Sequence, residues 1–94
     1  MTFYVYVLFN KEHSKIYIGQ TQDVVERLRI HNERIFKKSY TAAFSGFWEL
    51  IYREEFENRK EALRREKQLK SFQGRRFLKE NIIPAWRNGS ADAC

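Results

Sequence analysis

Four polar side chains near the start of the chain have types that could perform acid–base chemistry beside a bound anion. Tyr6 and Tyr17 each interrupt an otherwise aliphatic run, and Arg27 and His31 follow four residues apart. On a helix, Arg27 and His31 would be neighbours at the edge of the apolar stripe. A guanidinium can bind two phosphate oxygens, an imidazole can exchange a proton near neutral pH, and a phenol becomes a base beside positive charge. The structural alternative is that both tyrosines are ordinary core residues, that Arg27 packs its aliphatic stem against the core, and that His31 is simply a polar residue at the edge of the helix.

A fifth residue of interest, Glu66, is a carboxylate in the apolar stripe of a predicted helix. Helical periodicity places Glu66 between Ala62 and Leu63, with Leu69 close by. Burying an unpaired carboxylate is costly, so Glu66 must be paired, bind a cation or lie at the rim of a cleft. An ion pair with Arg27 or a lysine and a metal site are both open on this evidence.

Two strands are expected to position the tyrosines. Residues 3–9 are apolar throughout, which is typical of a strand covered on both faces, and residues 14–19 predict a second strand. A polar turn at residues 10–13 predicts a hairpin in which Phe9 lies opposite Ser14 and Tyr6 lies opposite Tyr17. The two phenols then share a face, whereas a one-residue slip would separate them.

Helix signals follow the hairpin. Asp23 with Glu26 three residues later matches a capping box for a helix that begins at Val24. Its periodicity predicts one apolar side, formed by Val24, Val25, Leu28 and Asn32.

The second half of the chain predicts one more strand and two more helices. Residues 47–52 have strand character, and residues 34–46 suggest a mobile basic loop. Asn58 and Glu61 form a second capping box, for a helix that runs to about Lys70. A break around Gly74 is expected to separate it from a short basic helix at residues 75–81.

Length and composition indicate one small domain. The chain has 94 residues, and we expect a domain over residues 1–83 and a disordered tail over 84–94, since Pro84 ends regular structure. No apolar run approaches the ~18 residues of a membrane span, and the N-terminus lacks a signal-peptide pattern. The lone Cys94 cannot form an internal disulfide or a zinc cluster. A cytoplasmic protein is therefore expected.

The charge balance points to a polyanionic partner. The formal charge is +6 and the pI is near 9.7, which favours nucleic acid or an acidic membrane face. No predicted helix pairs a strong apolar face with a uniformly basic one, which argues against the membrane. Trp48 and Tyr40 could stack on bases. The structural alternative is that the basic residues only form a solvated surface. The basic residues expected to follow a phosphate backbone are Lys37, Lys38, Arg64, Arg65, Lys67, Lys70, Arg75 and Arg76.

Taken together, these residues resemble the GIY-YIG nuclease family, in particular its small single-domain bacterial members. Tyr4-Val5-Tyr6 stands in place of the first triplet, with Tyr4 where the family name has Gly, and Tyr17-Ile18-Gly19 is the second triplet. Arg27, ten residues past Tyr17, and His31 match the family's helix residues, and residues 61–70 resemble the segment whose second glutamate, here Glu66, binds metal. The resemblance covers roughly residues 3–80.

The resemblance implies an α+β fold with a small three-stranded, mostly antiparallel sheet flanked by helices. It also implies phosphodiester hydrolysis with one divalent cation, Mg²⁺ or Mn²⁺, held by Glu66. Arg27 would bind the scissile phosphate, Tyr6 and Tyr17 would position and deprotonate water, and His31 would assist the proton transfer. Gln20 stands where some members have a lysine, which places the acid–base work on the tyrosines and His31.

The leading hypothesis is a metal-dependent endonuclease that acts on DNA and has a part in DNA repair. With no second domain in view, we expect structure-directed, single-strand-directed or weakly specific cutting by a monomer or weak dimer. One alternative is a nucleic-acid-binding module that does not cleave. Another is an interaction subunit whose protein partner supplies specificity.

Overall fold

The computed structural model describes residues 1–33 and 40–83. Expectations for residues 34–39, which include Lys37 and Lys38, and for residues 84–94 lie outside this part of the chain. Within it, no helix has the length and apolar character needed to cross a membrane. The elements in chain order are β1 (Phe3–Asn10), β2 (Lys15–Thr21), α1 (Val24–Glu33), a 3₁₀ turn η1 (Thr41–Ala43), β3 (Trp48–Phe56), α2 (Arg59–Lys70), α3 (Phe72–Phe77) and a π-helical turn η2 (Leu78–Ile82).

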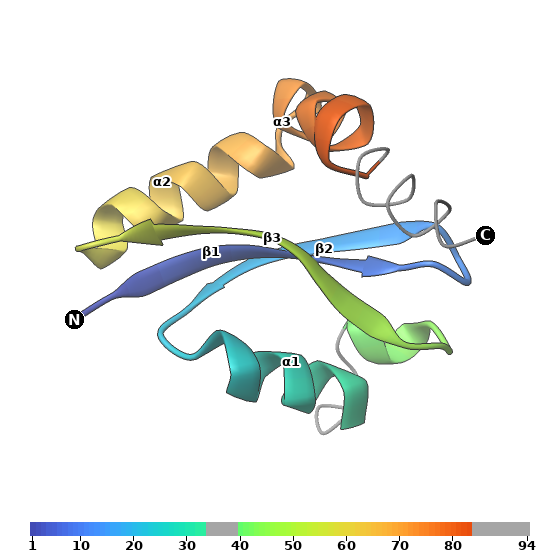
Figure 1. Ribbon diagram of the computed structural model, residues 1–94. Coiled ribbons are helices and arrows are strands. Elements are labelled where there is room, and N and C mark those ends of the chain that lie inside the picture. Colours follow the sequence, from blue (N-terminus) through green and yellow to red (C-terminus); the bar gives the residue numbers. More distant parts are fainter. Residues whose placement is uncertain (34–39, 84–94) are drawn as a thin grey trace.

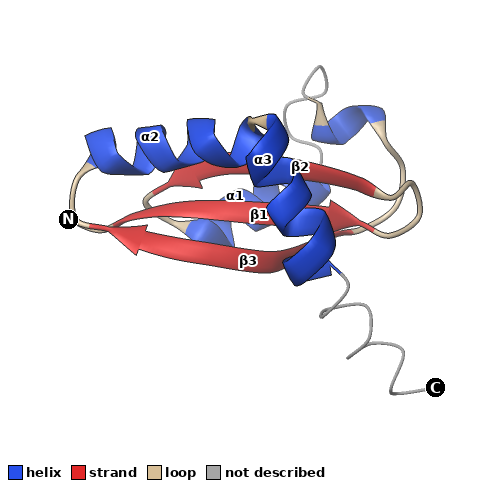
Figure 2. Ribbon diagram, turned by 90° about the horizontal axis from the view of Figure 1, so that it is seen from above, coloured by secondary structure: helices blue, strands red, loops and turns tan. Residues whose placement is uncertain are grey.

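The expected three-stranded antiparallel sheet with flanking helices is confirmed. The strand order is β2-β1-β3, so β1 is central and β2 is one edge of the sheet. Helices α2 and α3 cover one face and α1 covers the other, as Figure 1 shows. Residues 5–10 of β1 are all buried, because both faces are covered. Seen from above in Figure 2, α2 lies along the sheet and the two edge strands flank β1.

The two faces of the sheet have separate hydrophobic clusters. The first is on the side of α2 and consists of Val5, Val7, Ile18, Ala62, Leu69 and Leu78. The second is on the side of α1 and consists of Tyr6, Leu8, Val24 and Trp48. Successive residues of β1 contribute to opposite clusters, as strand geometry requires. Tyr6 therefore belongs to the face that α1 covers.

The predicted register of the hairpin is wrong by two residues. Tyr6 pairs with Gly19 and Leu8 pairs with Tyr17, so the loop comprises residues 11–14 instead of 10–13. Asn10 extends β1 because its buried side chain is satisfied there: its amide donates to the Ser45 carbonyl and its carbonyl accepts from the His13 backbone. A shift of two residues preserves the alternation of faces, so the phenols still share one.

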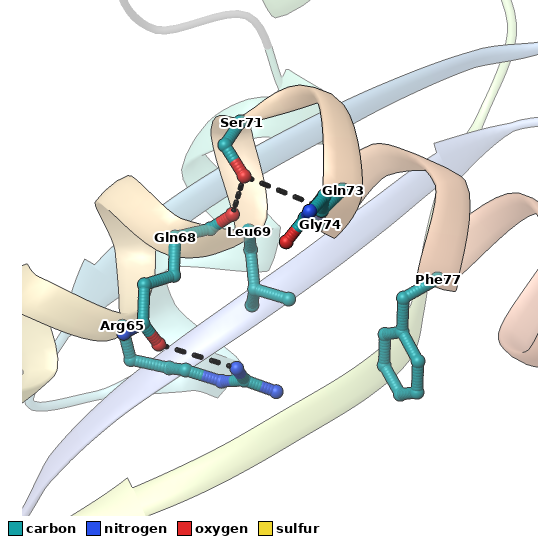
Figure 3. A pocket seen from close by; sticks show the side chains of 7 residues that line it. All are labelled: Arg65, Gln68, Leu69, Ser71, Gln73, Gly74 and Phe77. Atoms are coloured by element: carbon teal, nitrogen blue, oxygen red, sulfur yellow. Dashed lines mark hydrogen bonds between the residues drawn. The ribbon is translucent and has the colours of Figure 1, made fainter.

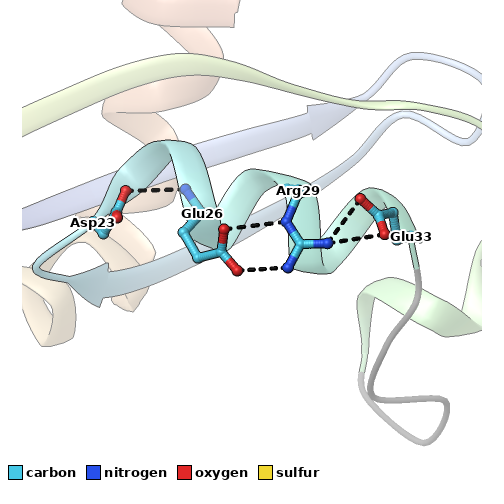
Figure 4. A network of polar contacts seen from close by, with 4 residues as sticks. All are labelled: Asp23, Glu26, Arg29 and Glu33. Carbon is cyan, nitrogen blue, oxygen red and sulfur yellow. Dashed lines mark hydrogen bonds and ion pairs between the residues drawn. The ribbon is translucent and has the colours of Figure 1, made fainter.

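Helix α1 begins where the sequence predicts. The Asp23 carboxylate accepts from the backbone N–H of Glu26 at 3.0 Å. On the exposed side, Arg29 bridges Glu26 and Glu33, a network shown in Figure 4. The assignment of Val25 to the apolar side is wrong, since this residue is 80% exposed. At α1's C-terminal end, Asn32 exchanges two hydrogen bonds with the backbone of Trp48, which attaches α1 to β3.

The second half contains the expected strand and helices with shifted boundaries. Strand β3 continues to Phe56, four residues beyond the predicted range, because it pairs with β1 on both sides of an irregularity at Ile51. Asn58 caps α2 through a hydrogen bond from the Glu61 backbone at 2.9 Å, as predicted. The break between helices lies at Ser71, not Gly74.

Ser71 both ends α2 and begins α3. Its hydroxyl donates to the Gln68 carbonyl and accepts from the Gly74 N–H, as seen in Figure 3. A Cβ on Gly74 would lie 2.2 Å from that same carbonyl, so glycine allows the first turn of α3 to pack against the end of α2. The predicted helix at residues 75–81 is therefore α3, which begins earlier, and the turn η2 after it.

Candidate active site

Gly19 creates the space in which the two phenols meet. It lies opposite Tyr6 in the β1–β2 ladder, and a Cβ at this position would lie 2.8 Å from the Tyr6 hydroxyl and 3.0 Å from the Tyr17 ring. The two tyrosine ring centres are 6.1 Å apart. Only a residue without a side chain fits beneath both rings. The strand pairing thus brings Tyr6 and Tyr17 together on the face of α1.

His31 projects from α1 toward these rings. Its Nε2 atom is 3.0 Å from the Tyr6 hydroxyl, and its ring centre is 4.7 Å from that of Tyr17. The imidazole is 6% exposed. Burial, with a smaller contribution from Arg27, lowers the pKa of His31, so the ring is neutral at pH 7 and can accept a proton.

Thr41 is a member of this cluster that sequence reasoning missed. Its hydroxyl is 2.8 Å from Nδ1 of His31, and its carbonyl accepts from the Trp48 indole at 3.0 Å. Thr41 is fully buried in η1. No motif marks this residue, because it comes near His31 only through the fold. It fixes the orientation of the imidazole.

Arg27 adds positive charge to the same cluster. Burial raises the pKa of Tyr6 well above its usual value, Tyr17 adds to the rise, and the Arg27 guanidinium opposes it. Tyr6 is therefore a neutral phenol at pH 7. Among the described residues, Nε of Arg27 is the one buried side-chain polar atom that lacks a hydrogen-bond partner. A buried charged donor without a partner is unfavourable, and the same arginine lines the pocket with Arg59, where its charge favours an anion.

Glu66 lies on α2, in the layer opposite to that of α1 (Figure 1). Its carboxylate is 19% exposed and accepts from Lys70 at 2.7 Å, so the expected ion pair with a lysine is present. Lys70 lines a pocket against β2 together with Tyr17, Tyr40 and Arg75. Glu66 lies one turn before Lys70 on α2, and its ion pair joins it to a residue of this pocket.

A second depression lies further along β2. It is lined by Arg27, by Arg59 of α2, by Phe3 and by residues 20–22. Cations from both layers thus line the two pockets along β2, Arg27 and Arg59 in one and Lys70 and Arg75 in the other. The sequence does not reveal that Arg59 lies near Arg27, because their proximity depends on how α2 crosses the sheet.

The other predicted nucleic-acid contacts are spread more widely. Arg65 lies toward β3, where its guanidinium binds Glu54 at 2.9 Å, and it lines the pocket at the α2–α3 junction shown in Figure 3. Arg64 and Lys67 are exposed on α2, and Arg76 is exposed and paired with Glu80.

Only one of the two aromatic residues expected to stack on bases is accessible. Trp48 is fully buried in the core, so its predicted stacking role is wrong. Tyr40 is 48% exposed, and its ring stacks on that of Tyr17 with centres 6.3 Å apart. The alternation of residues in β3 does not show which of its two faces α1 covers, so the burial of Trp48 beneath α1 could not be predicted.

The donor set fits a weakly held hard cation at Glu66. Among the described residues, no group of three or more histidine, cysteine, aspartate or glutamate side chains forms a metal cage. Mg²⁺ does not require one, since it usually retains several waters and binds one or two carboxylates plus substrate phosphate. Glu66 is a partly exposed carboxylate of the kind that such an ion binds.

Comparison with known proteins agrees with this arrangement. The sequence profile described as the GIY-YIG catalytic domain matches residues 2–80. Among solved structures, the UPF0213 protein from Bacillus halodurans, determined by solution NMR, is similar, with 27% sequence identity, a TM-score of 0.53 and 90% of each chain covered. No curated protein sequence matches the chain significantly. Since the profile spans every element around the β2 edge, the chain belongs to the GIY-YIG family and has its nuclease-type fold.

Proposed function

We propose that this protein is a divalent-metal-dependent endonuclease that hydrolyses phosphodiester bonds in DNA. Nucleases of this family generally depend on a divalent metal ion. The observation that carries the proposal is the unpartnered, buried Nε of Arg27, located beside the hydrogen-bonded pair of Tyr6 and His31. A phosphate would satisfy the guanidinium and place its phosphorus near two phenol oxygens.

Arg27 binds the scissile phosphate in this proposal. Its planar guanidinium donates to two oxygens and offsets the negative charge that develops in the transition state. Because Arg27 is half-buried, its charge is screened less than that of a surface arginine.

Tyr6 and His31 form a relay for the proton of the attacking water. A neutral Tyr6 accepts the water proton at its hydroxyl oxygen while it passes its own proton to Nε2 of neutral His31. Hydroxide then attacks phosphorus while the P–O bond to the leaving sugar oxygen breaks. That oxygen takes a proton from solvent, and the imidazolium returns its proton to solvent through Tyr6. Tyr17, with its ring against both Tyr6 and His31, orients the water. Thr41 keeps Nε2 aimed at Tyr6 through its contact with Nδ1.

Glu66 is the residue that would hold a single Mg²⁺ or Mn²⁺. When bound, such an ion supplies positive charge that stabilises the phosphate and the leaving oxygen. Lys70 must release the Glu66 carboxylate for this, and its ammonium is then free to bind a backbone phosphate. The ion pair therefore couples metal binding to substrate binding.

Basic side chains support nucleic acid as the substrate class. Lys70 and Arg75 line the pocket at Tyr17, and Arg64, Lys67 and Arg76 extend the positive surface over α2 and α3. Arg65 would contribute only at the β3 side. DNA as the polymer, and cutting directed by structure or single strands, are part of the proposal. The expected DNA repair role, the cytoplasmic location, a specificity-giving protein partner and a monomer or weak dimer stay predictions.

The decisive experiment is cleavage of end-labelled single- and double-stranded DNA with Mg²⁺ or Mn²⁺. Wild type, Glu66→Gln and Glu61→Gln are compared, with EDTA as a further condition. Glu61 is an exposed carboxylate on the same helix, so its replacement is the matched control. We expect metal-dependent cutting by wild type and Glu61→Gln and none by Glu66→Gln. Equal cutting by Glu66→Gln and wild type would refute the assignment of the metal ligand.

A non-cleaving nucleic-acid-binding module is the second candidate. The Glu66–Lys70 ion pair favours it, because a carboxylate already neutralised by lysine needs no cation. DNA binding by wild type without cutting under any metal condition would select this function.

A further inference from the structure

An aromatic side chain lies exposed on α3, outside the cluster around Tyr6. Phe72 is 81% exposed, whereas Phe77 of the same helix packs against Tyr52 with ring centres 6.1 Å apart. A single exposed apolar residue needs no explanation by itself. The side chains around Phe72, however, suggest a reason for its exposure.

Three cationic side chains lie around this ring. Phe72 lines a pocket together with Arg75, Arg76, Lys79 and Glu80. Arg75 and Arg76 are three and four residues from Phe72, the spacing of one α-helical face, and Lys79 follows in η2. Arg76 is paired with Glu80 at 2.9 Å. An aromatic ring among arginine and lysine side chains is the combination that proteins use to bind single strands, because cations follow the phosphates and rings stack on bases.

This surface is continuous with the candidate active site. Arg75 lines the pocket of Phe72 and also the pocket of Tyr17, Tyr40 and Lys70. Its Nε donates to the Lys70 carbonyl at 3.2 Å, which holds the guanidinium between the two pockets. A strand bound at Tyr17 therefore has a path across Arg75 to Phe72.

We propose that Phe72 stacks on an unpaired base of a nucleic-acid strand that extends from the β2 edge across α3. This inference rests on the proposed nucleic-acid function and specifies its substrate class. Bases inside a duplex already stack on their neighbours, so the ring can bind only single-stranded, frayed or flipped nucleotides. Phe72 thereby gives the chain a preference for such substrates that phosphate contacts alone do not give.

The test measures binding without hydrolysis, by fluorescence anisotropy in EDTA. The probes are a labelled single strand of mixed sequence and the blunt duplex of the same sequence. Phe72→Ala should bind the single strand roughly 5- to 150-fold more weakly, corresponding to a stacking energy of ~1–3 kcal/mol, with unchanged duplex affinity. Phe72→Tyr should retain single-strand affinity, and Phe72→Leu should behave like Phe72→Ala, since stacking requires a π face.

Val25→Ala is the matched control, because Val25 is 80% exposed on α1, in the opposite layer. It should change neither affinity. Equal losses on both probes, or no loss with Phe72→Ala, would overturn the proposal. So would a wild-type dimer that Phe72→Ala converts to a monomer, which would make this surface a contact between two copies.

The outcome also separates this proposal from the proposed hydrolysis. Wild type that binds the single strand through Phe72 without cutting in Mg²⁺ supports the stacking contact and refutes the nuclease. Wild type that cuts while Phe72→Ala binds normally refutes only the stacking contact. Wild type that binds neither probe refutes both.

Discussion

The hydroxyl of Tyr6 and the Nε2 atom of His31 are 3.0 Å apart, although 25 residues separate them in the sequence. Both side chains are buried. Burial raises the pKa of the Tyr6 phenol and lowers the pKa of the His31 imidazole, so both shifts favour the neutral forms. A neutral phenol beside a neutral imidazole is a donor–acceptor pair ready to transfer a proton. Thr41 fixes the other side of the ring, so the pair has one geometry.

The lowered pKa of His31 predicts a loss of stability on acidification. The unfolded imidazole titrates near 6.5 and the folded one lower, because burial and Arg27 disfavour its charged form. Below about pH 6.5 the unfolded state binds a proton that the folded state does not, so the free energy of unfolding falls as pH decreases toward the folded pKa. Urea unfolding between pH 5 and 7.5 should show this slope.

His31→Gln should flatten that slope, since glutamine does not titrate. His13→Gln replaces the other histidine, which is exposed, and provides the comparison. If wild type and His31→Gln lose stability in parallel over this range, the imidazole is not held neutral by its environment.

Gly19→Ala should separate the two phenols. The new Cβ would lie 2.8 Å from the Tyr6 hydroxyl and 3.0 Å from the Tyr17 ring, so both rings must move. We expect a stability loss of about 1–3 kcal/mol, as for other overpacked sites. Cleavage should fall about 100-fold or more, because displaced phenols no longer contact His31.

Val7→Ala serves as the stability control for this change. Val7 is fully buried on the opposite face of β1, so its truncation destabilises the fold without moving the phenols. At a temperature where both variants are folded, Val7→Ala should cut DNA and Gly19→Ala should not. Similar activities would show that only stability matters at Gly19.

Most of the fold was predictable because local signals agree with the final packing. The caps Asp23 and Asn58 bond to backbone groups three residues away, and β1 is marked in the sequence by its unbroken apolar run. The hairpin register was not predictable, since it depends on a hydrogen bond from the Asn10 side chain to the Ser45 carbonyl, 35 residues away in the sequence. The exposed position of Val25 likewise reflects how α1 lies on the sheet.

The candidate site divides in the same way. Tyr6, Tyr17, Arg27 and His31 follow from strand alternation and helix spacing, which are local rules. Thr41 and Arg59 could not be placed, because Thr41 reaches His31 from the turn η1 and Arg59 reaches Arg27 from α2 in the opposite layer. Trp48 was misassigned as a surface ring, since strand periodicity gives two faces without saying which one a helix will cover.

Arg27 and Arg29 should differ sharply when replaced. Arg27 is half-buried with an unpartnered Nε, whereas Arg29 is exposed and bound to Glu26 and Glu33. Arg27→Ala should reduce cleavage by roughly 10²–10³-fold, the usual effect of removing one donor to the transition state. Arg27→Lys should recover little, since lysine cannot bind two oxygens in a plane.

Arg29→Ala should leave the cleavage rate unchanged and lower the melting temperature slightly, because surface ion pairs contribute little. Single-turnover cleavage and thermal unfolding of the variants measure the two effects. Equal losses of cleavage at both positions would indicate general electrostatic attraction in place of a specific phosphate site.

Lys70→Met should strengthen metal binding at Glu66. The Lys70 ammonium is 2.7 Å from the carboxylate and competes with any cation there. Its removal frees the carboxylate and removes one like charge, so Mn²⁺ affinity should rise by about tenfold, given the size of interactions between charges at this range. Titration calorimetry with Mn²⁺ in the absence of DNA measures this directly. Lys60→Met, an exposed change on the same helix, should leave Mn²⁺ affinity unaltered.

DNA affinity should decrease in Lys70→Met, since the same ammonium is proposed to bind a phosphate once it is released. An unchanged Mn²⁺ affinity in Lys70→Met would mean that the ion binds elsewhere, and that the Glu66–Lys70 pair is structural.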